Sequence, residues 1–197
     1  RRATHQSQAV WLRLQSIVSI QSGRIRRASL MSIVGRTPAL VLKTEEATEK
    51  IASSLANACA NVFNGQFPIS IWLVGDLGAG KTTFTRYFLR TLGHLGKVKS
   101  PTYNLCEPYE IEHNPTMMVH HFDLYRMNHP NEWQEAGFRD TLTNPGISLI
   151  EWPEKAEGTL PKPDLEIFLT MNIDESREMS FEQHSDIGQR ILNSLKS

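Results

Sequence analysis

The stretch GDLGAGKTT, residues 75–83, follows directly on the apolar run ISIWLV, residues 69–74. It matches the pattern G-x-x-x-x-G-K-[ST] at every fixed position, and it stands between a strand-like and a helix-like segment, the context that supports a phosphate-binding loop. Glycines suit such a loop because backbone N–H groups turn inward around the phosphate, where side chains would block their approach. The stretch therefore predicts a strand, a phosphate-binding loop and a helix in direct succession.

Two side chains of this loop carry specific chemistry. Lys81 would reach the outer phosphates as a point charge, and Thr82 would offer its hydroxyl to Mg²⁺. The N-terminus of the following helix would add its own partial positive charge. The alternative interpretation is a glycine-rich turn before an ordinary core helix, but the strand-like run before the loop and the helical pattern after it both favour nucleotide binding.

The segments around the loop alternate as in an α/β protein. A short strand is expected over residues 39–42, and Thr44 with the two glutamates that follow it is typical of a helix start, in a helix that runs to about residue 63. After the loop, apolar residues at helical spacing predict a buried stripe of Phe84, Phe88, Leu92 and Leu95. We expect a three-layer α/β fold of the P-loop NTPase type, with a mostly parallel central sheet and helices on both faces.

Two carboxylates end apolar, strand-like segments. Residues 147–150 lead into Glu151, and residues 117–122 lead into Asp123. Because ligands of open α/β sheets bind outside the carboxyl ends of the strands, both side chains can face the phosphates, one to hold a metal and the other to orient water. The alternatives are a solvated carboxylate for Glu151 and a turn cap over residues 124–126 for Asp123.

The segment SPTY, residues 100–103, lies where switch segments of phosphate-loop proteins commonly lie. A hydroxyl there could contact metal, water or the γ-phosphate, although the bare pattern is weak. His120 and His121 are adjacent, so on a strand they point to opposite faces, and we do not expect them to share a metal. One of them is expected to be a core histidine with a hydrogen-bond partner.

The charge distribution separates a leader from the body of the chain. Residues 1–30 hold six of the 21 basic residues and none of the 21 acidic ones. That composition is typical of a transit peptide, but we expect residues 1–30 to be disordered or non-native upstream sequence and assign a single P-loop domain to residues 31–197. The acidic body lacks the basic stripe of a nucleic-acid binder, so any nucleic acid is expected to be handled by a partner.

The cysteines and the apolar segments allow predictions about the cellular compartment of the protein and about membrane association. Cys59 and Cys106 lie outside any C-x-x-C or metal-ligand spacing, so we expect free thiols in a reducing, cytoplasmic environment. No apolar run approaches the ~20 residues that span a bilayer, and no membrane partner is expected.

Five blocks of sequence then combine into a resemblance. They are GDLGAGKTTFTRYFL, VKSPTYNLCEPY, HHFDLYRMNHPNEW, GFRD and SLIEWPEKAEGTLPKPDLEI. In this order and spacing, over roughly residues 39–177, they resemble the bacterial TsaE (YjeE) family, the ATPase of tRNA threonylcarbamoyladenosine synthesis. The loop pattern is common to many NTPases, whereas the HFDLYR and IEWP blocks make the match specific. The leader departs from the family, and residues 110–116 look slightly different in length.

The resemblance implies roles for individual residues. It implies Thr82 and Glu151 at the magnesium ion and Trp152 near the nucleotide. It associates Asp123 with hydrolysis and places Thr102 in a switch-like segment close to the γ-phosphate. Contacts with the ATP phosphates are implied for Gly75, Gly78, Ala79, Gly80, Lys81, Thr82 and Thr83, whereas Thr44 and Arg177 match positions near the nucleotide only loosely.

The resemblance also implies an activity and partners. The domain would bind and hydrolyse Mg-ATP to support threonylcarbamoyladenosine (t6A) formation at the adenosine next to the anticodon, acting with TsaD and TsaB and contacting tRNA only indirectly. Asp123 or Thr102 would align the attacking water. No arginine finger is evident in the matched blocks, although Arg126 could serve as one or could bind a partner. Hydrolysis by the isolated chain is therefore expected to be slow.

Two other P-loop classes fit the loop and the fold. A small-molecule or nucleoside kinase is the main alternative, but such enzymes usually carry an arginine-rich lid, and no arginine cluster follows residues 147–151. A GTP-dependent switch is the third, and no N-K-x-D base-reading motif follows the loop.

Overall fold

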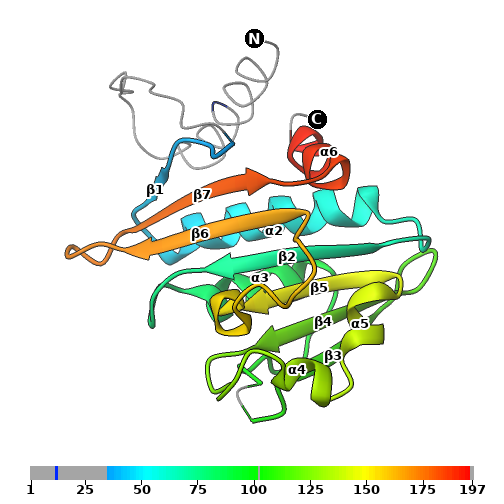
Figure 1. Ribbon diagram of the computed structural model, residues 1–197. Coiled ribbons are helices and arrows are strands. Elements are labelled where there is room, and N and C mark those ends of the chain that lie inside the picture. Colours follow the sequence, from blue (N-terminus) through cyan, green and yellow to red (C-terminus); the bar gives the residue numbers. More distant parts are fainter. Residues whose placement is uncertain (1–11, 13–34, 102, 196–197) are drawn as a thin grey trace.

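The computed structural model describes residue 12 and residues 35–101 and 103–195, so the expectation for the leader falls almost entirely outside the described residues. These residues form a seven-stranded sheet in the order β1-β7-β6-β2-β5-β4-β3. The strands are β1 (Leu40–Leu42), β2 (Pro68–Val74), β3 (Cys106–Ile111), β4 (Met117–Asp123), β5 (Gly146–Glu151), β6 (Leu165–Met171) and β7 (Arg177–Gln183). The helices are α2 (Glu45–Val62), α3 (Lys81–Thr91), α4 (Glu132–Glu135), α5 (Arg139–Thr143), α6 (Asp186–Ser194) and the short 3₁₀ helix η2 (Pro153–Ala156) (Figure 1).

The centre of the sheet is parallel. Strand β2 pairs in parallel with both β5 and β6, and β4 pairs in parallel with β5. The outer strands β1, β7 and β3 pair with their neighbours in antiparallel fashion. The carboxyl ends of the four central strands therefore meet at one edge, where ligands of open α/β sheets bind.

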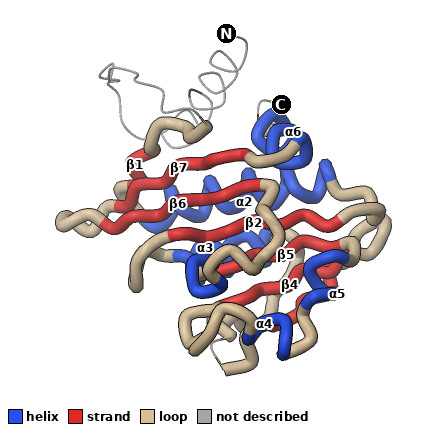
Figure 2. Tube along the Cα trace, in the orientation of Figure 1, coloured by secondary structure: helices blue, strands red, loops and turns tan. Residues whose placement is uncertain are grey.

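One face of the sheet is covered by α2, α3 and α6. Helices α2 and α3 lie behind the sheet in Figure 2, and α6 lies beyond the end of β7 at the upper right. Helix α2 begins where the sequence predicts, because the Thr44 hydroxyl accepts the backbone N–H of Ala47 at 3.2 Å and two glutamates occupy the first turn. Leu55 of α2 and Phe88 of α3 are fully buried with Ile71 of β2 in the same core cluster.

The other face is covered by α4, α5 and η2, which lie in front of the sheet (Figure 2). Phe122 and Ile150 point to this side and pack with Trp133 of α4, Leu142 of α5 and Ala156 of η2. Helices on both faces of a sheet with a parallel centre confirm the predicted three-layer α/β fold.

Helix α3 ends earlier than the apolar pattern of its sequence indicates. Phe84 and Phe88 are buried and Leu92 is partly buried, as predicted. Leu95 is 93% exposed, so the prediction that it belongs to the buried stripe was wrong. The physical reason is Gly93, whose φ of +101° turns the chain out of the helix while the N–H of His94 bonds the carbonyl of Leu89 at 3.0 Å.

Two further expectations concern the cysteines and the membrane. Cys59 and Cys106 are free thiols, as predicted, and both are buried. Of the helices in the described part of the chain, none combines the length and the apolar character that crossing a bilayer requires.

Candidate nucleotide-binding site

The loop between β2 and α3 has the conformation that its glycines predict. Gly75, Gly78 and Gly80 all have positive φ values, of +155°, +83° and +103°. A Cβ atom on Gly75 would lie 2.1 Å from the carbonyl oxygen of Leu169 in β6, so no other residue fits without moving that strand. Gly75 thus allows the loop to leave β2 beside β6.

Lys81 begins α3 and folds back over the loop. Its Nζ donates to the carbonyl oxygens of Gly75 and Asp76, the latter at 2.9 Å, and lies 3.8 Å from the ring centroid of Trp152. Burial lowers the pKa of Lys81, and the negative charge of Glu151 acts in the opposite direction. The lysine is held by neutral carbonyls and an aromatic face, partners that a phosphate can replace.

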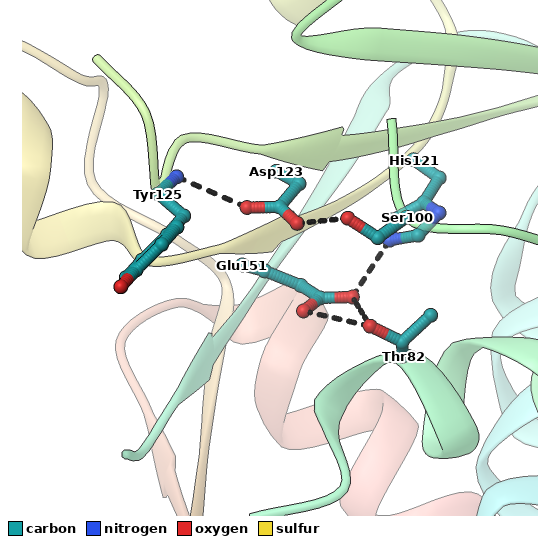
Figure 3. Close-up of polar contacts among 6 residues, drawn as sticks. All are labelled: Thr82, Ser100, His121, Asp123, Tyr125 and Glu151. Carbon is teal, nitrogen blue, oxygen red and sulfur yellow. Dashed lines mark hydrogen bonds and ion pairs between the residues drawn. The ribbon is translucent and has the colours of Figure 1, made fainter. Parts of the chain in front are cut away.

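Glu151 ends β5 and contacts two other side chains, those of Thr82 and His121. The Thr82 hydroxyl lies 2.9 Å from Oε1 and 3.1 Å from Oε2 of Glu151, and Nε2 of His121 lies 2.8 Å from Oε1 (Figure 3). The carboxylate is only 2% exposed, which excludes the solvated-carboxylate alternative. His121 is the predicted core histidine with a hydrogen-bond partner, since it is fully buried.

Asp123 ends β4 beside Glu151 and has separate partners. Its Oδ1 accepts the backbone N–H of Tyr125 at 3.0 Å, and its Oδ2 accepts the hydroxyl of Ser100 (Figure 3). The first bond confirms the turn-cap interpretation. The second joins Asp123 to the start of the SPTY segment, and Asp123 also borders the same cavity as the loop. The two readings of Asp123 are therefore compatible.

A cavity of about 390 Å³ opens at this edge of the sheet. The predicted site residues that line it are Gly78, Gly80, Lys81, Thr82, Thr83, Asp123, Glu151, Trp152 and Arg177. Among the described residues, Gly75, Ala79 and Thr44 were also predicted for the site but do not line this cavity. Thr44 caps α2, as its sequence predicts, and its loose match to a position near the nucleotide stays a prediction. Thr102 lies outside the described residues, so its predicted role remains a prediction.

Tyr125 lines the cavity but was given no role from the sequence, whereas Arg126, which also lines it, was left open between an arginine finger and a partner contact. Tyr125 has its ring centroid 4.9 Å from that of Trp152, and Arg126 has its guanidinium carbon 4.5 Å from the ring centroid of Tyr103. Trp152 has a left-handed φ of +59°, a conformation that is costly for a bulky residue and often occurs at functional sites. Tyr125 lies in the block HFDLYR, directly between residues already considered for the site, and that position was the available indication.

The donor set fits a hydrated magnesium ion with bound phosphates. Mg²⁺ prefers oxygen ligands and is commonly bound by one or two carboxylates together with phosphates. Thr82 and Glu151 bring a hydroxyl and a carboxylate together beside Lys81, at the carboxyl edge of the sheet. Gly78 and Gly80 line the cavity at positive φ and add no side chain of their own to it.

Comparison with known proteins decides the family. Residues 42–179 match the sequence model of the family described as "Threonylcarbamoyl adenosine biosynthesis protein TsaE". The chain belongs to the TsaE family. A TsaE protein of Haemophilus influenzae is 42% identical over 129 residues, which are 66% of this chain and 79% of the relative. A TsaE protein of Rickettsia felis is 37% identical over 142 residues, which are 71% of this chain and 76% of the relative.

A solved structure supports the same assignment for the fold. The crystal structure of YdiB from Bacillus subtilis superposes with a TM-score of 0.64 at 27% sequence identity, covering 84% of this chain and 97% of that one. These comparisons confirm both the resemblance to the TsaE family and the P-loop fold that the sequence predicted.

Proposed function

We propose that this TsaE-family chain binds and hydrolyses Mg-ATP and supports the formation of threonylcarbamoyladenosine in tRNA. Its curated relatives are named as tRNA threonylcarbamoyladenosine biosynthesis proteins. The observation that carries the ATPase part is the convergence of Lys81, Thr82, Asp123 and Glu151 on one cavity at the end of the parallel strands. A loop that only shaped a core helix would not need a buried lysine and two buried carboxylates at its mouth.

The loop and Lys81 would bind the phosphates. The backbone N–H groups of residues 78–83 and the N-terminus of α3 favour an anion, and Lys81 would exchange its carbonyl partners for phosphate oxygens. Arg177 lies over the loop, with its Nε 3.2 Å from the position that a Cβ on Gly80 would occupy, and would add positive charge there. Trp152 and Tyr125 offer an aromatic wall at the cavity mouth.

Thr82 and Glu151 would hold the magnesium ion. When bound, Mg²⁺ would neutralise charge on the outer phosphates. A hydroxyl has one proton and two lone pairs, so Thr82 can donate to Glu151 and still offer a lone pair to the cation. Glu151 is held in place by contacts with the Thr82 hydroxyl and with Nε2 of His121.

Asp123 would orient the attacking water. Asp123 is buried and lines the cavity, and it accepts a hydrogen bond from Ser100, the first residue of the SPTY segment. Movement of that segment when ATP binds would change what Asp123 can contact. Because no arginine finger is evident in the matched blocks, hydrolysis by the chain alone is expected to be slow, and TsaD and TsaB would raise it.

Phosphate release is the experiment that tests this function. We expect slow release of inorganic phosphate from Mg-ATP by the chain alone and a clear increase when TsaD and TsaB are added, with Lys81→Ala inactive in both. A partner that completes a phosphoryl-transfer site can add ~10³–10⁵ in rate. Transfer of the γ-phosphate to an added nucleoside or other small acceptor, without phosphate release, would show a kinase instead.

A further inference from the structure

His121 is a buried polar side chain for which the ATPase mechanism above has no task. It lies on β4, two residues before Asp123, so both side chains project from the same face of the sheet. It is fully buried, and its Nε2 lies 2.8 Å from Oε1 of Glu151. Burying a histidine is costly, and the Nδ1 atom of His121 has no hydrogen-bond partner among the described residues, so the contact of Nε2 with Glu151 needs an explanation.

The direction of this hydrogen bond follows from the partner. An ionised carboxylate only accepts, so Nε2 of His121 carries the proton and donates it to Glu151. The same oxygen also faces the Thr82 hydroxyl at 2.9 Å, whereas Oε2 faces only Thr82, at 3.1 Å, among the described residues. His121 therefore holds one named oxygen of Glu151 from the sheet side, while Thr82 approaches from α3 (Figure 3).

We propose that His121 is a positioning residue of the magnesium site, which fixes the Glu151 carboxylate in the orientation that Thr82 and the cation require. The inference rests on the proposed function, since it assigns the metal to Thr82 and Glu151. A carboxylate on a glutamate side chain rotates freely at its last torsion angle unless a partner holds it. Side chains that hydrogen-bond a metal ligand commonly change metal affinity or activity 10–100-fold when they are removed.

The adjacent residue provides a matched control. His120 lies on the same strand but points to the opposite face, where it pairs in register with Ser148 rather than contacting Glu151. His120→Leu and His121→Leu thus remove the same side chain from neighbouring positions, and only the second removes the donor to Glu151.

Two amide variants distinguish a side chain that can donate a hydrogen bond to Glu151 from one that is polar but too short to do so. In His121→Gln the side-chain amide can place an N–H close to the position of Nε2, whereas in His121→Asn the shorter side chain cannot reach Glu151. Both variants bury one amide in place of the imidazole. If only a polar filler were needed at this position, the two amides would behave alike.

The experiment measures how a fluorescent ADP analogue binds at increasing magnesium concentrations, and in EDTA. We expect His121→Leu and His121→Asn to raise the half-saturating magnesium concentration about 10–100-fold, with affinity in EDTA unchanged. His121→Gln should recover most of that loss, and His120→Leu should match wild type. A wild-type magnesium requirement in His121→Leu and His121→Asn would overturn the positioning role. Absence of magnesium-dependent binding by wild type would overturn the proposed function as well.

A measurement on the unaltered chain covers the case in which the variants do not fold. With ¹⁵N-labelled histidine, the Nε2 resonance of His121 should show a protonated, hydrogen-bonded nitrogen. It should shift when Mg²⁺ is added to the ADP-loaded protein, and the His120 resonances should not. A His121 resonance that is insensitive to magnesium, or an Nε2 without a proton, would contradict the proposal.

Discussion

Asp123 and Glu151 lie directly opposite each other at the ends of the parallel strands β4 and β5. Both carboxylates are buried, yet they have no hydrogen-bonding side chain in common among the described residues: Glu151 contacts Thr82 and His121, whereas Asp123 contacts Ser100 and the backbone of Tyr125. Glu151 is thus hydrogen-bonded to the residue that follows Lys81 of the phosphate-binding loop, and Asp123 is hydrogen-bonded to the first residue of the SPTY segment. Their neighbours give the two carboxylates different tasks.

Replacement of Lys81 should nearly abolish nucleotide binding. Lys81→Ala removes a charge-assisted contact worth about 1.5–3 kcal/mol, which corresponds to about 10–150-fold in affinity. The measurement is a titration with a fluorescent ATP analogue. Lys99→Ala, an exposed lysine beyond α3, is the control and should bind like wild type. Equal affinity of Lys81→Ala and wild type would contradict the role of the loop.

Gly75 should tolerate no side chain. In Gly75→Ala the added Cβ would clash with the backbone of Leu169, so either the loop or β6 must move, and we expect lower stability together with weaker nucleotide binding. Gly93→Ala is the matched control, because Gly93 also has a positive φ but has open space around it. Gly93→Ala should lower the free energy of unfolding by about 1 kcal/mol, through conformational strain alone, and should leave nucleotide binding unchanged. Thermal melting and nucleotide titration of both variants check this, and similar losses in both would contradict it.

The buried thiols should make stability depend on alkaline pH. Burial raises the pKa of Cys106 from 9.0 to about 12, with the charge of Glu107 adding to the effect, and burial also raises the pKa of Cys59. In the unfolded chain the thiols ionise near 9.0, so unfolding releases protons at higher pH. Their contribution to stability is complete below pH 9.0 and is lost as the pH rises toward the folded values.

Urea denaturation across this pH range checks the sign. The free energy of unfolding should fall above pH 9.0 in wild type, and fall less steeply in a Cys59→Ala, Cys106→Ala double variant, which lacks both groups. Identical slopes in the two proteins would show that the thiols do not contribute.

The fold was largely predictable because its decisive signals are local. The strand before the loop, the Thr44 cap and the extent of α2 are each determined within one segment, and the structure confirms them. The position of Leu95 was mispredicted because its helical spacing continues beyond a glycine that ends the helix. Strand order and the antiparallel edges depend on contacts between distant segments, which periodicity does not encode.

The candidate site divides in the same way. Lys81, Thr82 and the strand-end carboxylates could be predicted because a motif or a strand end marks them, and they line one cavity. The contact between His121 and Glu151 could not, because it depends on how β4 and β5 align. The hydroxyl of Thr44 caps α2, which its sequence context predicts, whereas its loose match to a position near the nucleotide stays untested.

The most direct test compares Glu151→Gln with Asp123→Asn. Each variant is measured for Mg-ATP affinity alone and for phosphate release with TsaD and TsaB present. Glu151→Gln should weaken magnesium-dependent binding, because a neutral amide loses the charge that a hard cation favours. Asp123→Asn should bind Mg-ATP like wild type and lose only hydrolysis. Asp123→Asn losing affinity while Glu151→Gln keeps it, or fast hydrolysis by the isolated wild-type chain, would contradict this account.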